Sequence, residues 1–211
     1  EGLAGADIFQ GGAGSDTVTF MHSTAAVVAD LSLTVAGTND ANGDQFIGIE
    51  NLTGTTLGDS LYGDGNNNIL DGLAGSNLLD GRGGVDTASY LSATGAVTIN
   101  MASNSVTGAG RSDTLVSIER VIGSNFGDSI TGTTGDDWID AGAGNDTVNG
   151  QSGTDTISYA SATSAVSVNL TLATQADGKQ LTSIENIFGS NNINGDILTG
   201  DANANVVEGG L

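Results

Sequence analysis

Apolar residues recur every nine residues over much of this chain. Between residues 123 and 158, four consecutive nine-residue segments carry Asp at the sixth place and an aliphatic residue at the eighth: GSNFGDSIT, GTTGDDWID, AGAGNDTVN and GQSGTDTIS. This pattern predicts a glycine-rich turn of six residues followed by a three-residue strand. The middle side chain of the strand enters a core, and its two neighbours face outward. Glycine supplies the positive φ angles that such a turn requires.

The same nine-residue pattern fills four blocks, residues 2–19, 54–89, 123–158 and 191–208. Together they hold twelve nonapeptides, and the eighth residue is large and apolar in all of them except the one with Ala88. The predicted core positions are Phe9, Val18, Leu61, Leu70, Leu79, Ala88, Ile130, Ile139, Val148, Ile157, Leu198 and Val207. The opening turn of each later block departs from the glycine pattern, at Leu57, Phe126 and Asn194.

Inserts that resemble one another separate the blocks, at residues 20–53, 90–122 and 159–190. Each begins with alternating apolar residues, at Val27/Leu31/Leu33, Val97/Ile99/Met101 and Val166/Val168/Leu170/Leu172. Each then has an apolar triplet, at Phe46/Ile49/Leu52, Leu115/Ile118/Val121 and Leu181/Ile184/Ile187. Alternation is typical of half-buried strands. We expect the inserts to be wider coils of the same structure, with a protruding variable loop at residues 37–44 or 174–179.

Block and insert together repeat every 69 or 70 residues, as the equivalent residues Asp16, Asp86 and Asp155 show. A fixed period of this length indicates units that bury their apolar faces against their neighbours. The sequence therefore predicts an all-β fold, a single continuous β-solenoid over residues 1–211 made of about three cassettes. Because the last residues nearly repeat the first, we expect the chain to be a piece of a longer array.

The charge of the chain indicates what kind of partner it binds. The chain has 25 acidic and 4 basic residues, a net charge of −21, 34 glycines and no cysteine. Nucleic acids and anionic membranes require basic patches, so neither is an expected partner. No stretch approaches the roughly 20 apolar residues of a membrane span. The expected partner is a cation, which can stabilise a chain that has no disulfides.

The sixth position of every nonapeptide carries a side-chain oxygen. It is Asp at Asp7, Asp16, Asp59, Asp86, Asp128, Asp137, Asp146, Asp155 and Asp196, and Asn at Asn68, Asn77 and Asn205. Two nonapeptides make one circuit, so alternate turns stack on the same edge about 4.8 Å apart, the ordinary spacing of paired strands. The sixth-position oxygens of stacked turns then face one another.

The segment GGAGSDTVT, residues 11–19, matches every specified position of G-G-x-G-x-D-x-U-x and so resembles the calcium-binding nonapeptide of the RTX (hemolysin-type) family. The resemblance implies a right-handed parallel β-roll. It also implies several Ca²⁺ ions between successive turns, bound by the twelve sixth-position residues and by turn carbonyls. Calcium suits this chemistry because it takes six to eight oxygen ligands.

Within that resemblance, two sites have two carboxylates each and are the strongest predictions. One pairs Asp128 with Asp146, and the other pairs Asp137 with Asp155. Asn replaces one carboxylate in the pairs Asp59 with Asn77 and Asn68 with Asp86. These should bind calcium more weakly or stay empty.

A glutamate, Glu50, Glu119 or Glu185, follows isoleucine at the end of each insert. Two roles are open for it. It could be a calcium ligand at the junction with the next block, or it could bind a nearby backbone amide or face water.

Catalysis is not expected. The single histidine, His22, is matched by Ser92 and Ser161 in the other cassettes, so no histidine site repeats. A positioned base beside a nucleophile is therefore missing from the pattern. Trp138 should point outward, either as a contact surface or as an isolated surface aromatic.

The most consistent function is a calcium-dependent structural segment of a large secreted bacterial surface protein, in a surface layer, filament or adhesin. The resemblance further implies type I secretion, folding outside the cell and an extracellular or surface-attached location. The expected partners are further cassettes of the same chain, with possible lateral self-association. The alternative is an auxiliary β-roll of a secreted enzyme, which assists secretion and folding or binds glycan.

Overall fold

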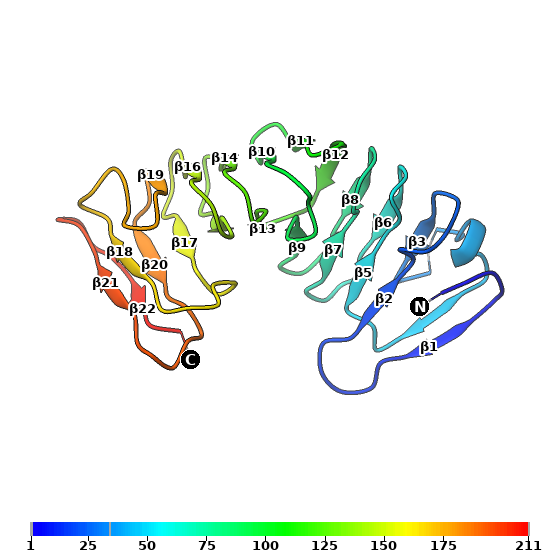
Figure 1. Ribbon diagram of the computed structural model, residues 1–211. Helices are drawn as coiled ribbons and strands as arrows, with labels where there is room; N and C mark the ends of the chain where they lie inside the picture. Colours follow the sequence, from blue (N-terminus) through cyan, green and yellow to red (C-terminus); the bar gives the residue numbers. More distant parts are fainter. Residues whose placement is uncertain (1, 34, 211) are drawn as a thin grey trace. The chain divides into compact units, whose positions relative to one another are not determined.

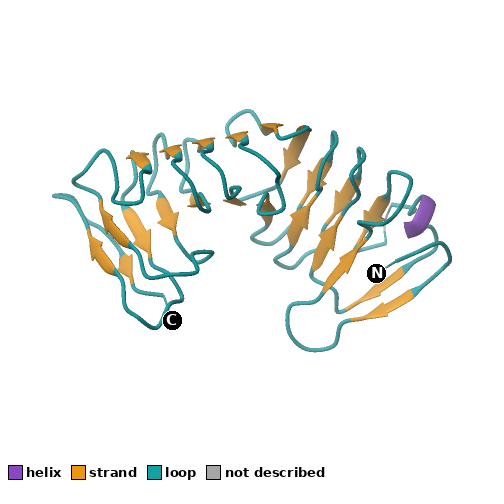
Figure 2. Cartoon of the chain, viewed as in Figure 1, coloured by secondary structure: helices purple, strands orange, loops and turns teal. Residues whose placement is uncertain are grey.

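Short parallel strands joined by turns make up nearly the whole computed structural model, which describes residues 2–33 and 35–210 (Figures 1 and 2). Its one helical segment in this range is the 3₁₀ turn η1 (Asn39–Ala41). Contacts divide the chain into two compact units, residues 1–92 with 104–119 and residues 93–103 with 120–211. Among the described residues no helix has the length and apolarity to cross a membrane.

The first unit has two main layers of parallel strands. One layer contains β2 (Thr17–Thr19), β5 (Asn51–Thr53), β7 (Ile69–Asp71) and β9 (Thr87–Ser89). The other contains β3 (Val28–Asp30), β6 (Ser60–Tyr62), β8 (Leu78–Asp80) and β12 (Arg111–Val116), with β11 (Ser105–Gly108) antiparallel to β12. A separate parallel pair joins β1 (Ile8–Gln10) to β4 (Gln45–Ile47).

The second unit repeats this arrangement. One layer contains β13 (Arg120–Ile122), β15 (Trp138–Asp140), β17 (Thr156–Ser158), β20 (Asn186–Phe188) and β22 (Val207–Glu208). The other contains β10 (Thr98–Asn100), β14 (Ser129–Thr131), β16 (Thr147–Asn149) and β19 (Gln180–Thr182). A further pair joins β18 (Ser167–Asn169) to β21 (Ile197–Thr199). The predicted all-β parallel roll is confirmed.

The core of each unit is a ladder of the middle residues of these strands. In the second unit Val121 pairs in register with Ile139, which pairs with Ile157, and that residue with Ile187. All four side chains are at most 1% exposed. Each buried side chain of this size stabilises the fold by about 1.5–3 kcal/mol. The nonapeptides and the inserts both contribute to this ladder. Of the predicted core positions, Phe9 and Leu198 are only half-buried. The prediction is wrong for Val207, which is 44% exposed.

The inserts also form strands that pair with the nonapeptide strands, through β3, β10 and β18. The alternating pattern overpredicted their length. Leu33 has φ of 57° and is 52% exposed, and Leu172 is 51% exposed, so both lie outside the core. After β3 the chain turns because the buried Asp30 carboxylate accepts backbone hydrogen bonds from Ser32 and Val35.

We expected the variable loops to protrude, but parts of them are buried. Asp44, Gln175 and Lys179 are all at most 5% exposed. In the loop at residues 174–180, a backbone bridge joins Thr174 to Gln180, and the Gln175 amide donates to the carbonyl of Leu172. These three polar residues of the variable loops therefore pack against the rest of the structure.

Candidate metal-binding turns

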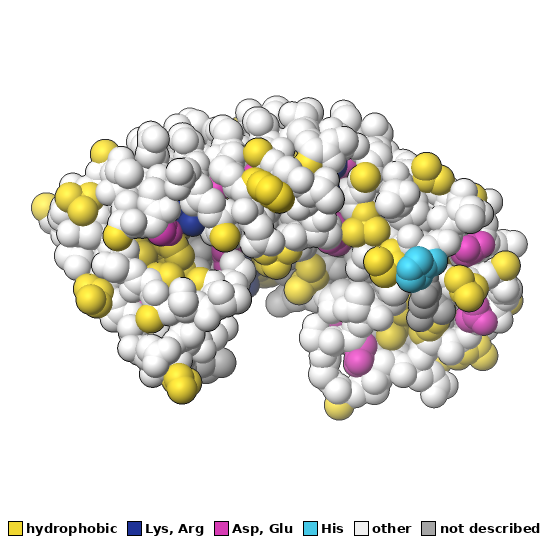
Figure 3. All heavy atoms as spheres, viewed as in Figure 1, with side chains coloured by type: hydrophobic (Ala, Val, Ile, Leu, Met, Phe, Trp, Pro, Cys, Tyr) yellow, Lys and Arg dark blue, Asp and Glu magenta, His cyan; other side chains and the backbone are white. Residues whose placement is uncertain are grey.

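The acidic side chains of the turns are directed inward rather than to solvent. Eight sixth-position residues are buried: Asp59, Asn68, Asn77, Asp86, Asp128, Asp137, Asp146 and Asp155. The other four, Asp7, Asp16, Asp196 and Asn205, are half-buried. Figure 3 accordingly shows only scattered acidic atoms on the face that it displays, although the net charge is −21. A buried carboxylate is unfavourable unless it is paired.

Stacked turns are linked through these side chains. The backbone N–H of Asp128 donates to Oδ1 of Asp146 at 2.8 Å, and the N–H of Asp137 donates to Oδ1 of Asp155 at 2.9 Å. The structure brings the two Asn-bearing pairs together in the same way, Asp59 with Asn77 at 2.9 Å and Asn68 with Asp86 at 2.7 Å. The stacking inferred from the sequence places these residues side by side.

Eight of the nine Asp-bearing turns are of two kinds, which the sequence analysis did not separate. In the first kind, a backbone N–H near the start of the turn donates to Oδ2 of the sixth-position carboxylate, and a hydroxyl donates to Oδ1. This holds for Asp59, Asp128, Asp137 and Asp196, which bond to Thr55, Ser124, Thr133 and Ser190, with the N–H to Oδ2 distance 2.6 Å in each. We call these closed turns, because both carboxylate oxygens are bonded within the protein.

Asparagine turns are satisfied by their own amide groups. The side-chain NH₂ of Asn68 donates to the Glu50 carbonyl at 2.9 Å, and that of Asn205 donates to the Glu185 carbonyl at 2.7 Å. The NH₂ of Asn77 donates to Oδ1 of Asp113 at 2.8 Å. A donor group thus lies where a carboxylate would offer an oxygen to a cation.

In the second kind of turn, which we call open, Oδ2 of the sixth-position Asp is buried and accepts no hydrogen bond. The open turns are those of Asp16, Asp86, Asp146 and Asp155. Their second residue has a positive φ, 68° at Arg82 and 78° at Gln151. In three of these turns its N–H donates to the side chain of the last residue of the preceding strand, from Arg82 to Asp80, from Gly142 to Asp140 and from Gln151 to Asn149. This amide is therefore not donated to Oδ2.

Three open turns form equivalent sites, one in each cassette, at Asp16, Asp86 and Asp155. Each begins with a glycine, Gly11, Gly81 or Gly150, and each faces a backbone carbonyl of the insert, from Gly48, Ser117 or Ser183. A Cβ at any of these glycines would collide with both the Asp side chain and that carbonyl. The glycine therefore leaves a space on which two kinds of oxygen converge. We call these three the glutamate-edge sites.

The repeated glutamates bind backbone amides at these sites. Oε2 of Glu50 accepts the N–H of Asp16, Oε2 of Glu119 that of Asp86, and Oε2 of Glu185 that of Asp155, each at 2.9 Å. Of the two roles left open by the sequence, the structure shows the second. Each glutamate also adds a negative charge next to the open carboxylate.

Electrostatics at these sites favour an added positive charge. Burial, together with the nearby Glu119, Asp64 and Asp80 carboxylates, raises the pKa of Asp86 to about 6, against the opposing hydrogen bond from the Asn68 amide. Burial likewise raises the pKa of Asp155, with Asp137 and Glu185 adding to the effect. A cation at the open oxygen would relieve both the missing solvation and the repulsion.

Over the part of the chain that the structure describes, no three acidic or histidine side chains converge on one point. A metal at a glutamate-edge site would therefore be held by one open carboxylate and by turn carbonyls, with water completing the shell. A hard cation such as Ca²⁺ accepts this all-oxygen set, so the residues present fit it.

A family model for the RTX calcium-binding nonapeptide repeat, in four copies, matches residues 1–20, 53–88 and 122–157. The chain contains RTX calcium-binding nonapeptide repeats. The matched ranges coincide almost residue for residue with the first three predicted blocks. RTX repeats are structural and calcium-binding rather than catalytic, and the proteins that contain them are typically secreted. No curated protein matches this RTX chain at a significant level.

Two carboxylates with the same features as the open turns were missed by the sequence analysis. Asp44 and Asp113 lie at equivalent places in the first two inserts, and each accepts a sixth-position N–H at 2.9 Å, from Asp7 and Asn77. Oδ2 of each is buried and accepts no hydrogen bond. The signal available in the sequence is an Asp five residues before the first two Ile-Glu pairs.

Proposed function

We propose that this chain is a calcium-rigidified structural segment of a large secreted bacterial surface protein, such as a surface layer, filament or adhesin, and that it folds outside the cell. One observation carries the proposal: the glutamate-edge site recurs in every cassette with the same open carboxylate, the same facing carbonyl and the same bonded glutamate. Repetition of one binding site without a catalytic group is what structural material requires.

The chain's residues divide the work of binding. Asp86 would supply the ligand oxygen, Ser117 a carbonyl, and Gly81 the space between them, while Glu119 holds the backbone amide of the turn. Calcium, when bound, supplies the positive charge that these oxygens lack. Without it, buried carboxylates repel one another and the glycine-rich turns are costly to order. Binding and folding are thus expected to be coupled, as in other metal-stabilised domains.

The test is a calcium titration of chelator-treated protein, followed by far-ultraviolet circular dichroism and by the calcium bound per chain. We expect a cooperative transition from coil to β-structure with several ions bound. The double variant Asp86→Ala/Asp155→Ala should bind fewer ions and need at least about tenfold more calcium, because two open carboxylates are lost.

The matched control is Asp40→Ala/Glu208→Ala, which removes the same charge from two side chains outside the glutamate-edge sites. It should fold at the calcium concentration of the parent protein. A β-spectrum that is insensitive to chelator, or a double variant that behaves like its control, would overturn the proposal.

The proposed partners are further cassettes of the same kind and, laterally, other copies of the chain. We expect self-association to depend on calcium, because the metal would both order the roll and reduce its net negative charge. Sedimentation at several protein concentrations, with and without calcium, measures it directly. A monomer under all conditions would exclude lateral assembly of this segment.

A further inference from the structure

The insert position that carries Asp44 and Asp113 carries Lys179 in the third cassette. All three lie five residues before the Ile-Glu of their insert. The backbone confirms that they are equivalent. The residue that follows each donates its N–H to the carbonyl of a sixth-position residue, from Gln45 to Asp7, from Thr114 to Asn77 and from Gln180 to Asp146. A cationic side chain therefore replaces a carboxylate at one of three matching places.

The Lys179 ammonium lies among oxygen atoms of a stacked turn and a loop. Nζ is 3.1 Å from Oδ2 of Asp146, 3.3 Å from the carbonyl oxygen of Gly144 and 3.2 Å from Oδ2 of Asp177. Asp146 Oδ2 is the oxygen that is left open in the turn itself. Both Lys179 and Asp146 are almost completely buried, with side chains 4% and 0% exposed.

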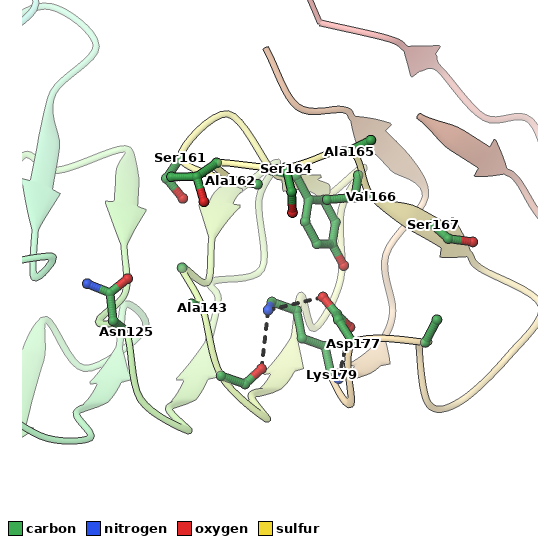
Figure 4. A pocket seen from close by; sticks show the side chains of 15 residues that line it. Asn125, Ala143, Ser161, Ala162, Ser164, Ala165, Val166, Ser167, Asp177 and Lys179 are labelled. Carbon is green, nitrogen blue, oxygen red and sulfur yellow. Dashed lines mark hydrogen bonds and ion pairs between the residues drawn. The ribbon is translucent and has the colours of Figure 1, made fainter. Parts of the chain in front are cut away.

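The surroundings hold this ammonium in place. Nζ lies 5.7 Å from the centre of the buried Tyr159 ring, within the range of a cation–π contact. Lys179, Tyr159 and Asp177 line a pocket of about 450 Å³, and Figure 4 shows the ammonium directed at the Asp177 carboxylate there. Two carboxylates and a carbonyl around a cation form the same kind of oxygen set that the other open turns present without one.

The turn also departs from the metal-site pattern at its first residue. Ala141 stands where the equivalent turns have Gly2 and Gly72, and it is completely buried. At Gly72 an added Cβ would lie 2.5 Å from the Asn77 amide nitrogen. The glycine that keeps space open at the sixth-position side chain is thus absent where Lys179 is present.

We propose that the Lys179 ammonium is a built-in replacement for calcium at the Asp146 turn, so that this turn is closed without metal. The inference rests on the proposed function, because it presupposes that other open turns bind calcium. The residue five positions before Ile-Glu would then decide whether the turn binds metal. An acidic residue at this position allows a metal ion to bind, and a lysine excludes the metal ion.

The experiment counts calcium bound per chain at saturation, by metal analysis after equilibrium dialysis, in the full chain and in Lys179→Asp. With Asp146, Asp177 and a new carboxylate at residue 179, the variant should bind one calcium more than the parent protein. Lys179→Arg, which keeps a cation, should bind the same number as the parent. Gln180→Asp, which adds a carboxylate at the exposed neighbouring position, is the matched control and should also leave the number unchanged.

An unchanged calcium count in Lys179→Asp, or an increase shared by Gln180→Asp, would overturn the inference. Loss of β-structure by Lys179→Asp in saturating calcium would also overturn it, because a metal ion should substitute for the ammonium. These outcomes are separate from failure of the proposed function, in which the parent protein itself would bind no calcium.

Discussion

At the scale of single residues, the decisive feature is what happens to Oδ2 of the sixth-position Asp. Where the second residue of the turn is Ser or Thr, as at Thr133, the hydroxyl and the amide bond the carboxylate and close the turn. Where it is Gln151, with a positive φ, the amide points to the preceding strand and Oδ2 stays open. Asp137 and Asp155 therefore share a motif position, but only Asp155 has a carboxylate oxygen available to a cation.

A comparison of two glycines in the Asp86 turn tests whether the space at Gly81, between the Asp86 carboxylate and the Ser117 carbonyl, is needed for binding. Gly81→Ala would place a methyl group against Oδ2 of Asp86 and the Ser117 carbonyl, whereas the nearest atom to a methyl at Gly83 is 3.9 Å away. Neither glycine has a positive φ, so backbone strain does not separate them.

We expect Gly81→Ala to lose one bound calcium and to lower the free energy of unfolding in calcium by about 1–3 kcal/mol, the usual cost of overpacking. Gly83→Ala should stay within about 0.5 kcal/mol of the parent protein, as surface changes do. Chemical denaturation at fixed calcium, with metal analysis, measures both. Equal effects of the two substitutions would show that the space at Gly81 is not a binding site.

At the scale of strands and turns, the nine-residue pattern predicts the structure well because one physical requirement, a buried middle residue, recurs without interruption. Ile130 and Ile139 lie at the centres of three-residue strands in the expected places. The inserts were predicted less well. The strand of the first insert ends early at Asp30, whose side chain accepts a hydrogen bond from the following backbone, and alternation alone does not reveal such a turn.

Removing one step of the core ladder should destabilise the second unit. Ile139 is completely buried between Val121 and Ile157, so Ile139→Ala leaves a cavity in a stack that cannot close around it. The expected loss is about 2–5 kcal/mol in the free energy of unfolding.

The control is Ser129→Ala, at an exposed position of strand β14. It should change the free energy of unfolding by less than about 0.5 kcal/mol. Denaturant unfolding in saturating calcium compares the two variants. A loss below about 1 kcal/mol for Ile139→Ala would mean that the stack relaxes around the gap.

The same scale shows what the sequence could not provide. The shared spacing before Ile-Glu aligns Asp44, Asp113 and Lys179, but it does not show that their side chains reach the sixth-position residues of the stacked turns. Trp138 is another example. It is half-buried, with Arg120 at 4.7 Å over its ring and Phe188 at 5.2 Å, so it is not an isolated surface aromatic.

For the whole molecule, the buried carboxylates link stability to pH differently with and without calcium. Since the pKa of Asp86 is raised to about 6 from an ordinary value of 3.8, the calcium-free folded state holds a proton that the unfolded chain releases in this range. Its contribution to stability is complete below pH 3.8 and is lost as the pH rises through about 6.

With calcium, ionised carboxylates are the ligands, so protons compete with the metal. In saturating calcium the folded carboxylate stays ionised, so Asp86 should lower stability only where the unfolded chain takes up protons, near its ordinary pKa of 3.8. Thermal unfolding from pH 4.5 to 7.5 should therefore show a stability that falls with rising pH in chelator and changes little in saturating calcium. Asp86→Asn should reduce the slope in chelator, and an equal slope in calcium would contradict the linkage.

One set of hydrogen bonds between stacked turns has a direction. The backbone N–H of a sixth-position residue donates to a side-chain oxygen later in the sequence, from Asn68 to Asp86 to Glu119, and from Asp137 to Asp155 to Glu185. For these bonds each turn depends on chain that is made after it. Shortening the protein from its C-terminal side removes these side-chain acceptors from the turns that remain, whereas shortening it from the N-terminal side removes only their donors. During synthesis or export, a turn would stay incomplete until the coil that follows it has arrived.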